Sequence, residues 1–166
     1  MVCTAHFTTA IGVCTLRWSD AGVTGFQLPE APADSSATEP PAGLPANIAA
    51  LIERVRRHLR GDLQDFRDVP FAWETVTPFQ QAVLRATLAI GPGRTTTYGE
   101  IAAALGAPPS SSRAVAAALG ANPWPLLVPC QRIIGADGKM TGFSGPGGIR
   151  TKVRLLALEG AQLLAE

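Results

Sequence analysis

The chain has 166 residues, 46% of them hydrophobic, which is enough to form one domain of ordinary size or two small ones. The net charge of +1 combines two halves of opposite sign. Residues 1–75 carry six basic and nine acidic side chains, giving −3, whereas residues 76–166 carry eight and four, giving +4. A basic C-terminal half is compatible with nucleic-acid binding but does not establish it.

Several classes of protein are excluded. Three cysteines form an odd set without Cys-x-x-Cys spacing, which argues against a disulfide framework, and reduced thiols favour the cytoplasm. The N-terminus lacks the charged segment and apolar run of a signal peptide. No apolar segment reaches the ~20 residues that a membrane helix needs. We therefore expect a cytoplasmic protein that does not associate with a membrane.

Residues 1–75 are predicted to form a small α/β domain. It begins with three short strands, at 2–7, 12–18 and 23–28. The turn sequence at 19–22 joins the second and third strands in a hairpin. A metal site here is disfavoured, because the candidate ligands match no zinc spacing and lack a fourth member; they are Cys3, His6 and Cys14.

A proline-rich loop, 29–46, separates these strands from a helix that should begin after the N-cap Asn47 and end at Gly61. Apolar residues recur along one face of this helix at Ile48, Leu51, Ile52, Val55 and Leu59. Arginines lie on or near the opposite face, and we interpret them as a solvated surface rather than a nucleic-acid patch; they are Arg54, Arg56, Arg57 and Arg60. We predict that His58 lies on the helix surface.

Residues 76–166 are predicted to form a second, mainly helical domain. Capping boxes at Thr77–Gln80 and Thr97–Glu100 open two helices, which end near 91–93 and at Leu105, and serines at 110–112 cap a third helix over 113–119. Two short helices joined by a tight turn are typical of a helix-turn-helix, although many helical hairpins without a DNA role share this pattern.

The helix at 113–119 consists almost entirely of small residues after Arg113. Alanine is common in such a segment simply because it favours helix. Alternatively, small side chains allow the helix backbone to approach a surface closely, with Arg113 as the one long side chain. The pattern alone favours neither interpretation.

The stretch 128–135 contains the residue best suited to chemistry, Cys130. The apolar run at 124–127 is expected to cross the core and to deliver Cys130 to the edge of a pocket. A lone cysteine is more often a small buried hydrophobe, but the neighbouring Arg132 could favour the thiolate. A glycine-rich loop at 141–148 could close over a flat ligand, and a last helix begins near Ile149.

These segments together resemble the O6-alkylguanine-DNA alkyltransferases, the methylated-DNA–protein-cysteine methyltransferases. Each alone is unspecific, but the set occurs in family order and is highly specific: Thr77-Pro78-Phe79-Gln80, Thr97-Tyr98-Gly99-Glu100-Ile101-Ala102, Ser112-Arg113-Ala114-Val115, Asn122-Pro123, Pro129-Cys130 with Arg132, and Leu155 to Glu159. Residues 1–75 match in layout only. The resemblance implies an α+β fold, with a small N-terminal antiparallel sheet and a helix before a mainly helical, helix-turn-helix (winged-helix-like) catalytic domain.

The resemblance also implies DNA repair by direct, single-turnover transfer of an alkyl group from O6-alkylguanine, or from O4-alkylthymine, to Cys130. The helix-turn-helix would enter the minor groove of double-stranded DNA, and the damaged base would be flipped out because its alkyl carbon is inaccessible in a stacked duplex. The family requires no metal or organic cofactor, and we expect a monomer.

Site residues follow from the same match. The catalytic group comprises Cys130, Gln131, Glu159 and Asn122, and the substrate- and DNA-binding group comprises Tyr98, Arg113, Ala114, Ala117, Arg132, Phe143 and Ser144. Arg113 would fill the gap left by the extruded nucleotide, and Tyr98 would help to rotate the base out. Phe143 and Ser144 would line the base pocket, although many members have tyrosine in place of Phe143.

One departure from the family bears on the chemistry. The family pattern is Pro-Cys-His-Arg, and this chain has Gln131 at the histidine position. In the family that histidine connects the thiol, through water, to a glutamate that matches Glu159. An imidazole can accept a proton near neutral pH and an amide cannot. Because His6 and His58 are far away in sequence, we expect Cys130 to lack an evident base and to react more slowly.

Two other functions remain open. A damage sensor would flip alkylated bases with little or no transfer, and Gln131 is the feature that favours it, whereas retention of Cys130 favours repair. A helix-turn-helix regulator is the third possibility, but the sequence has no evident dimerisation element or sensor domain.

Overall fold

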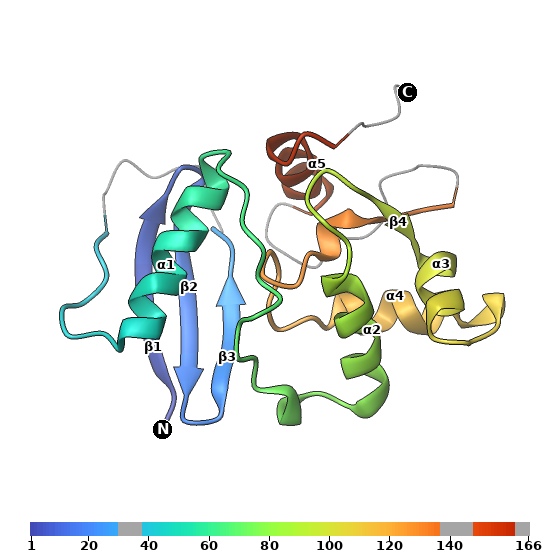
Figure 1. The fold of residues 1–166 in the computed structure, drawn as a ribbon, viewed down its shortest axis with the longest axis horizontal. Coiled ribbons are helices and arrows are strands. Elements are labelled where there is room, and N and C mark those ends of the chain that lie inside the picture. Colours follow the sequence, from blue (N-terminus) through green and yellow to red (C-terminus); the bar gives the residue numbers. More distant parts are fainter. Residues whose placement is uncertain (30–37, 137–147, 162–166) are drawn as a thin grey trace.

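A computed structural model describes residues 1–29, 38–136 and 148–161. A three-stranded sheet with one long helix lies beside a group of shorter helices (Figure 1). This arrangement confirms the α+β fold with a small antiparallel sheet followed by mainly helical structure. None of the helices in the described part of the chain is long and apolar enough to cross a membrane.

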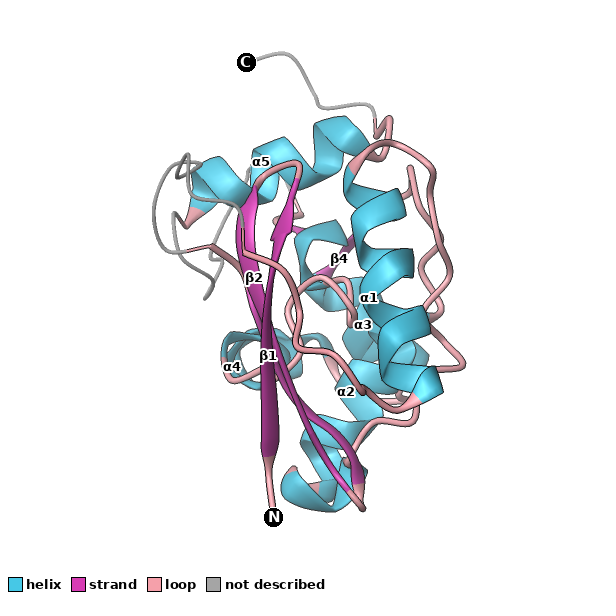
Figure 2. Cartoon of the chain, turned by 90° about the vertical axis from the view of Figure 1, so that its left-hand side faces the viewer, coloured by secondary structure: helices cyan, strands magenta, loops and turns pink. Residues whose placement is uncertain are grey.

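The sheet consists of β1 (Cys3–Thr9), β2 (Gly12–Ser19) and β3 (Gly22–Gln27), which are antiparallel and adjacent in chain order. The three predicted strands and the hairpin are therefore confirmed, with ends that differ by one or two residues. Alternating side chains of β2 and β3 point into the core, and α1 (Ala46–Leu59) covers that face of the sheet (Figure 2).

Helix α1 buries the predicted apolar stripe, but it starts one residue before Asn47, with Pro45 at the N-cap position, so Asn47 is not the cap. Each arginine of the opposite face pairs with a carboxylate: Arg54 with Asp68, Arg56 with Glu39, Arg57 with Asp62 and Arg60 with Glu53. The paired charges agree with a solvated protein surface and leave little free positive charge for nucleic acid.

The helical half follows a short turn, η1 (Trp73–Thr75), and comprises α2 (Pro78–Leu88), α3 (Tyr98–Ala104), η2 (Pro109–Ser111), α4 (Ser112–Gly120) and α5 (Ile149–Leu158). Helices α2, α3 and α4 pack against one another. The capping box between Thr97 and Glu100 is complete, which confirms that prediction.

Two capping predictions are wrong. Thr77 caps α2 by accepting a hydrogen bond from the backbone N–H of Gln80, but the Gln80 side chain does not complete a capping box. Its amide instead donates to the carbonyls of Ala118 and Ala121, at 3.3 and 3.0 Å, and so ties α2 to the C-terminal end of α4. No serine side chain caps α4, because the η2 turn leads directly into it.

A pair of two-residue strands links the start of α3 to the segment that contains Cys130. β4 (Thr96–Thr97) runs parallel to β5 (Ile133–Ile134), with Thr96 opposite Ile133. Strands this short carry no periodic signal, so they could not be predicted from the sequence pattern. The pairing places the start of α3 beside the turn that contains Cys130.

The segment before Cys130 is anchored to the sheet. Trp124 is fully buried, and its indole N–H donates to the carbonyl of Val23 at 2.9 Å. The backbone N–H of Phe26 donates to the carbonyl of Pro123 at 2.9 Å. Buried side chains of both halves also belong to one hydrophobic cluster. The boundary at residue 75, with domains at 1–75 and 76–166, stays a prediction.

Candidate active site around Cys130

Cys130 is the first residue of η3 (Cys130–Arg132), a single turn held at the end of the buried apolar run. Only 6% of the residue is exposed, as expected for a thiol delivered by a segment that crosses the core. Leu126, within that run, has a φ of 80°, a conformation that is unusual for a residue with a side chain. Such backbone is retained only where the surroundings require it and often occurs at functional sites.

Two opposing effects act on the pKa of the Cys130 thiol. Burial raises the pKa of Cys130, whereas a hydrogen bond with the Asn122 side chain, the charge of Lys152 and the backbone N–H groups of Cys130 and Leu126 act in the opposite direction. The net pKa is raised, so most of the protein holds a neutral thiol at neutral pH. The groups that favour the thiolate are nevertheless all directed at this sulfur.

Asn122 fixes the shape of the segment that precedes the cysteine. Its Oδ1 accepts a hydrogen bond from the backbone N–H of Trp124 at 2.8 Å, and its Nδ2 donates to the carbonyl of Val128 at 3.2 Å. These contacts close the loop between 122 and 128. The same side chain reaches the Cys130 thiol, so loop geometry and sulfur environment depend on one residue.

Lys152 is a site residue that the sequence analysis missed. It is fully buried in α5, its ammonium donates to the carbonyl of Ile133, and its Nζ lies 6.0 Å from the centre of the Tyr98 ring. Burial lowers its pKa to about 8, while the nearby Cys130 acts to raise it. The signal was present, because Lys152 falls on the same helical stripe as Leu155, Leu156 and Glu159.

Glu159 binds both residues that follow the cysteine. Its carboxylate is almost fully buried and accepts hydrogen bonds from the Arg132 guanidinium, with Nε at 3.0 Å from Oε2 and a second contact from Nη2. Gln131 Nε2 donates to Oε1 at 3.2 Å. Burial alone would raise the pKa of Glu159, but the surrounding donors, His58, Arg132 and Gln131, lower it overall. Glu159 is therefore held as a carboxylate.

Arg132 was expected to favour the Cys130 thiolate, but its guanidinium is directed elsewhere. Its guanidinium is occupied by Glu159 and by the carbonyl of Ile90, at 2.5 Å from Nη1. The positive charge that acts on Cys130 comes from Lys152 instead. Adjacent residues on a turn point in different directions, which is why closeness in sequence gave the wrong cation.

The prediction that His58 lies on the helix surface is wrong. His58 is 1% exposed, and its Nε2 lies 3.4 Å from Oε2 of Glu159. Its Nδ1 accepts a hydrogen bond from the backbone N–H of Gln64 at 3.0 Å. The helical period offered a signal, because His58 follows Leu51 by seven residues and Val55 by three and so shares their buried face.

The remaining predicted residues that the structure describes lie on α3 and α4. Tyr98 begins α3 and is half-buried, and Arg113, Ala114 and Ala117 lie on the exposed face of α4. The opposite face of α4 is buried through Val115, Ala118 and Leu119. Phe143 and Ser144 lie outside the described residues. Of the predicted site residues, the structure thus brings four together around the cysteine turn: Asn122, Gln131, Arg132 and Glu159.

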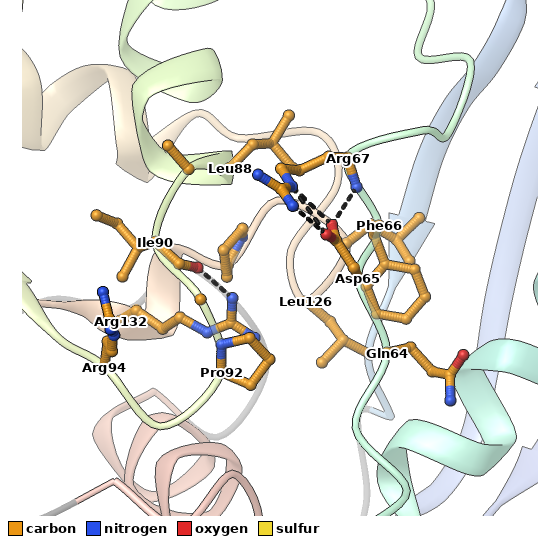
Figure 3. A pocket seen from close by; sticks show the side chains of 14 residues that line it. Gln64, Asp65, Phe66, Arg67, Leu88, Ile90, Pro92, Arg94, Leu126 and Arg132 are labelled. Atoms are coloured by element: carbon orange, nitrogen blue, oxygen red, sulfur yellow. Dashed lines mark hydrogen bonds and ion pairs between the residues drawn. The ribbon is translucent and has the colours of Figure 1, made fainter.

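A cavity of about 240 Å³ lies beside the site, between the 64–67 segment and the helical half (Figure 3). Pro129 and Arg132 line it, whereas Cys130 does not. Because Cys130 does not line this cavity, it is not the pocket in which a flipped nucleobase would meet the thiol. The expected pocket includes Phe143 and Ser144, which the structure does not describe.

The helical half places a buried cysteine turn beside the start of α3, and α4 exposes a face of small residues. These features suit a protein of the DNA-binding class. Residues 78–161 match the family model described as "6-O-methylguanine DNA methyltransferase, DNA binding domain". The chain belongs to this family, the methylated-DNA–protein-cysteine methyltransferases.

Relatives support the assignment over nearly the whole chain. The methylated-DNA–protein-cysteine methyltransferase of Mycobacterium tuberculosis is 38% identical over 156 residues, which is 94% of this chain and 91% of that protein. The one of Methanothermobacter thermautotrophicus is 38% identical over 146 residues, 88% of this chain and 78% of that protein. A crystal structure of the M. tuberculosis protein OGT in complex with DNA superposes with a TM-score of 0.77 at 36% identity, covering 95% of this chain and 92% of that one.

Proposed function

We propose that the protein repairs DNA by moving the alkyl group of O6-alkylguanine to Cys130 in a single turnover. The sulfur forms a bond to the alkyl carbon while the bond from that carbon to O6 breaks. Guanine leaves as an anion and regains the proton that the thiol loses. The observation that carries the proposal is the convergence of Asn122 and Lys152 on the buried Cys130. A thioether does not revert, so each molecule would react once.

DNA binding is assigned to α3 and α4. The exposed face of α4, with Ala114 and Ala117, is flat enough to enter a minor groove, and Arg113 extends from it. We propose that Arg113 occupies the space of the flipped nucleotide and that Tyr98 contacts the base beside Lys152 and Cys130. Extrusion is required because the alkyl carbon lies within the base stack.

Several finer points belong to the same proposal. O4-alkylthymine carries the same type of alkyl–oxygen bond and is proposed as a second substrate. The described cysteines are free, which fits a reducing cytoplasm, where we place the protein. We propose that it acts as a monomer on double-stranded DNA, and displacement by a thiolate requires no metal or organic cofactor.

A damage sensor is the second candidate function, and Gln131 favours it. The amide of Gln131 donates to Glu159 and cannot itself take up a proton, and the lowered pKa of Glu159 makes its carboxylate a weak acceptor of the thiol proton. Loss of general-base assistance is worth ~10²–10⁴-fold in rate. Such a loss would slow transfer and favour a role in which the protein binds and marks the lesion.

The variant Cys130→Ser separates the two functions. If the protein is a repair transferase, Cys130→Ser loses all transfer from an O6-methylguanine duplex and keeps its affinity for that duplex, because the serine hydroxyl is nearly isosteric. Cys14→Ser is the matched control, since Cys14 is buried in β2, away from the turn. Equal behaviour of the wild type and Cys130→Ser with this duplex would support the damage sensor.

A further inference from the structure

The long helix of the N-terminal half contributes a side chain to the cysteine site. His58 of α1 reaches the same Glu159 carboxylate that binds Gln131 and Arg132. The histidine and the glutamate are each about 99% buried in their side chains. A buried ionised carboxylate requires polar neighbours, and among the residues that the structure describes this imidazole is the one that reaches Glu159 from the N-terminal half.

We infer that His58 is a positioning residue for Cys130, which holds Glu159 from the N-terminal half and thereby fixes the turn that carries the thiol. The inference rests on the proposed transfer reaction. It assigns to this chain an imidazole at the glutamate even though position 131 has none. The imidazole comes from a different helix, α1, and lies nearest Oε2, the oxygen that also accepts from Arg132.

The hydrogen bond from Gln64 defines the form of the imidazole. The backbone N–H of Gln64 donates to Nδ1, so Nδ1 offers a lone pair and the neutral ring carries its hydrogen on Nε2. Nε2 lies 3.4 Å from Oε2 of Glu159, close enough for electrostatic attraction but outside the geometry of a formed hydrogen bond. The tautomer is assigned from the hydrogen-bond network. His58 therefore presents an N–H toward Glu159, and a base at this nitrogen is excluded in the neutral ring.

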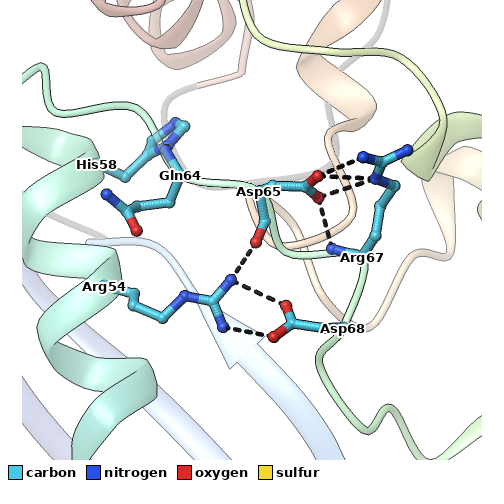
Figure 4. Close-up of polar contacts among 6 residues, drawn as sticks. All are labelled: Arg54, His58, Gln64, Asp65, Arg67 and Asp68. Carbon is cyan, nitrogen blue, oxygen red and sulfur yellow. Dashed lines mark hydrogen bonds and ion pairs between the residues drawn. The ribbon is translucent and has the colours of Figure 1, made fainter.

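Neighbouring groups hold the ring in this orientation. The Phe66 ring lies 5.4 Å from the His58 ring, centre to centre, and the Arg54 guanidinium lies over Phe66 at 5.3 Å. Arg54 is in turn held by the Asp68 carboxylate and the carbonyl of Asp65 (Figure 4). His58 is thus packed between α1 and the 64–68 segment, with only its Nε2 edge directed at Glu159.

The consequence for the thiol passes through Glu159. Two consecutive side chains after Cys130, those of Gln131 and Arg132, end on this carboxylate, so its position determines the position of η3. With hydrogen bonds from Gln131 and Arg132, and the His58 imidazole 3.4 Å from Oε2, Glu159 has little free acceptor capacity and serves as an anchor. A displacement of about 1 Å at a reacting atom can cost on the order of 100-fold in rate. A loosened anchor should therefore reduce the rate of alkyl transfer and leave the DNA-binding face unchanged.

Three substitutions at His58 test this inference. His58→Phe keeps a flat ring and removes both nitrogens, His58→Asn keeps a polar group near Nδ1, and His58→Gln keeps an N–H near the position of Nε2. We expect His58→Phe and His58→Asn to lower the single-turnover rate at saturating DNA by about 10- to 100-fold. His58→Gln should recover most of that loss. The affinity for the duplex should be unchanged in all three.

His6→Phe is the matched control, because His6 is the other histidine and lies exposed on β1 with a hydrogen bond to Thr15. A double-mutant cycle with Glu159→Gln gives a second readout, since His58→Phe should cause no further loss once the carboxylate is gone. Nitrogen NMR of the wild-type imidazole provides a test that needs no variant, and the hydrogen is expected on Nε2.

Transfer by His58→Phe at the wild-type rate, or a hydrogen on Nδ1 in the wild type, would overturn the inference and leave the proposed function intact. A wild-type protein that binds the O6-methylguanine duplex without transferring its methyl group would overturn the proposed function, and the positioning role with it. The two failures are therefore distinguishable in one set of experiments.

Discussion

Glu159→Gln tests the claim that one buried carboxylate organises the site. The substitution keeps the shape of the side chain and removes its charge, which leaves Arg132, 5% exposed, beside a neutral amide. Breaking a buried ion pair by removing one partner costs about 3–5 kcal/mol. For a chain of this size, about 1 kcal/mol lowers Tm by roughly 2–4 °C, so the loss corresponds to roughly 6–20 °C.

The assay is urea unfolding of Glu159→Gln beside Glu53→Gln. Glu53 pairs with Arg60 at 3.4 Å, but both side chains are more than half exposed, and an exposed pair contributes about 0–1 kcal/mol. Equal stability losses in the two variants would refute the reasoning that burial makes the Glu159 pair important.

The pH dependence of stability provides an independent test of the role of Glu159. The pKa of Glu159 is lowered in the folded protein, so its ionised form stabilises the native state above the ordinary glutamate value of 4.5. This contribution is lost as the pH falls below that value. Wild type and Glu159→Gln should therefore converge in stability in acid, whereas a constant difference between them would contradict the lowered pKa.

Two further substitutions concern the thiol. Lys152→Met should slow transfer at neutral pH, because the lysine charge favours the thiolate. The wild type should gain stability between about pH 8 and 10.5, where the unfolded lysine binds more protons than the folded one, and Lys152→Met should lack this gain. A normal transfer rate would exclude this charge effect. Gln131→His should accelerate transfer, by ~10²–10⁴-fold if the imidazole acts as a base, and an unchanged rate measured by quenched time points would show that position 131 is not limiting.

Sequence periodicity predicted the elements that carry their own signal. The strands of the sheet, the stripe of α1 and the Thr97–Glu100 capping box have local patterns, and all three are present. Asn47 shows the limit of local rules, because helix α1 starts before it in spite of its good capping propensity.

Site residues could be predicted from the sequence only where a single segment identifies them. Cys130, Gln131 and Glu159 could be named from their own segments, but their mutual contacts depend on packing between η3 and the end of α5. His58 and Lys152 were missed because a titratable residue on an amphipathic helix is usually exposed, and burial becomes evident only when its partner from another element is known. Reading both helices by face would have identified them as candidates.

The central claim is stoichiometric transfer to Cys130, and the most direct measurement is the intact mass of the wild-type protein after incubation with a duplex that contains one O6-methylguanine, followed by peptide mapping. We predict a single added methyl group, located on Cys130, even with Gln131 in the following position. A protein that remains unmodified while binding the duplex tightly, or that carries the methyl group on Cys3 or Cys14, would contradict the account.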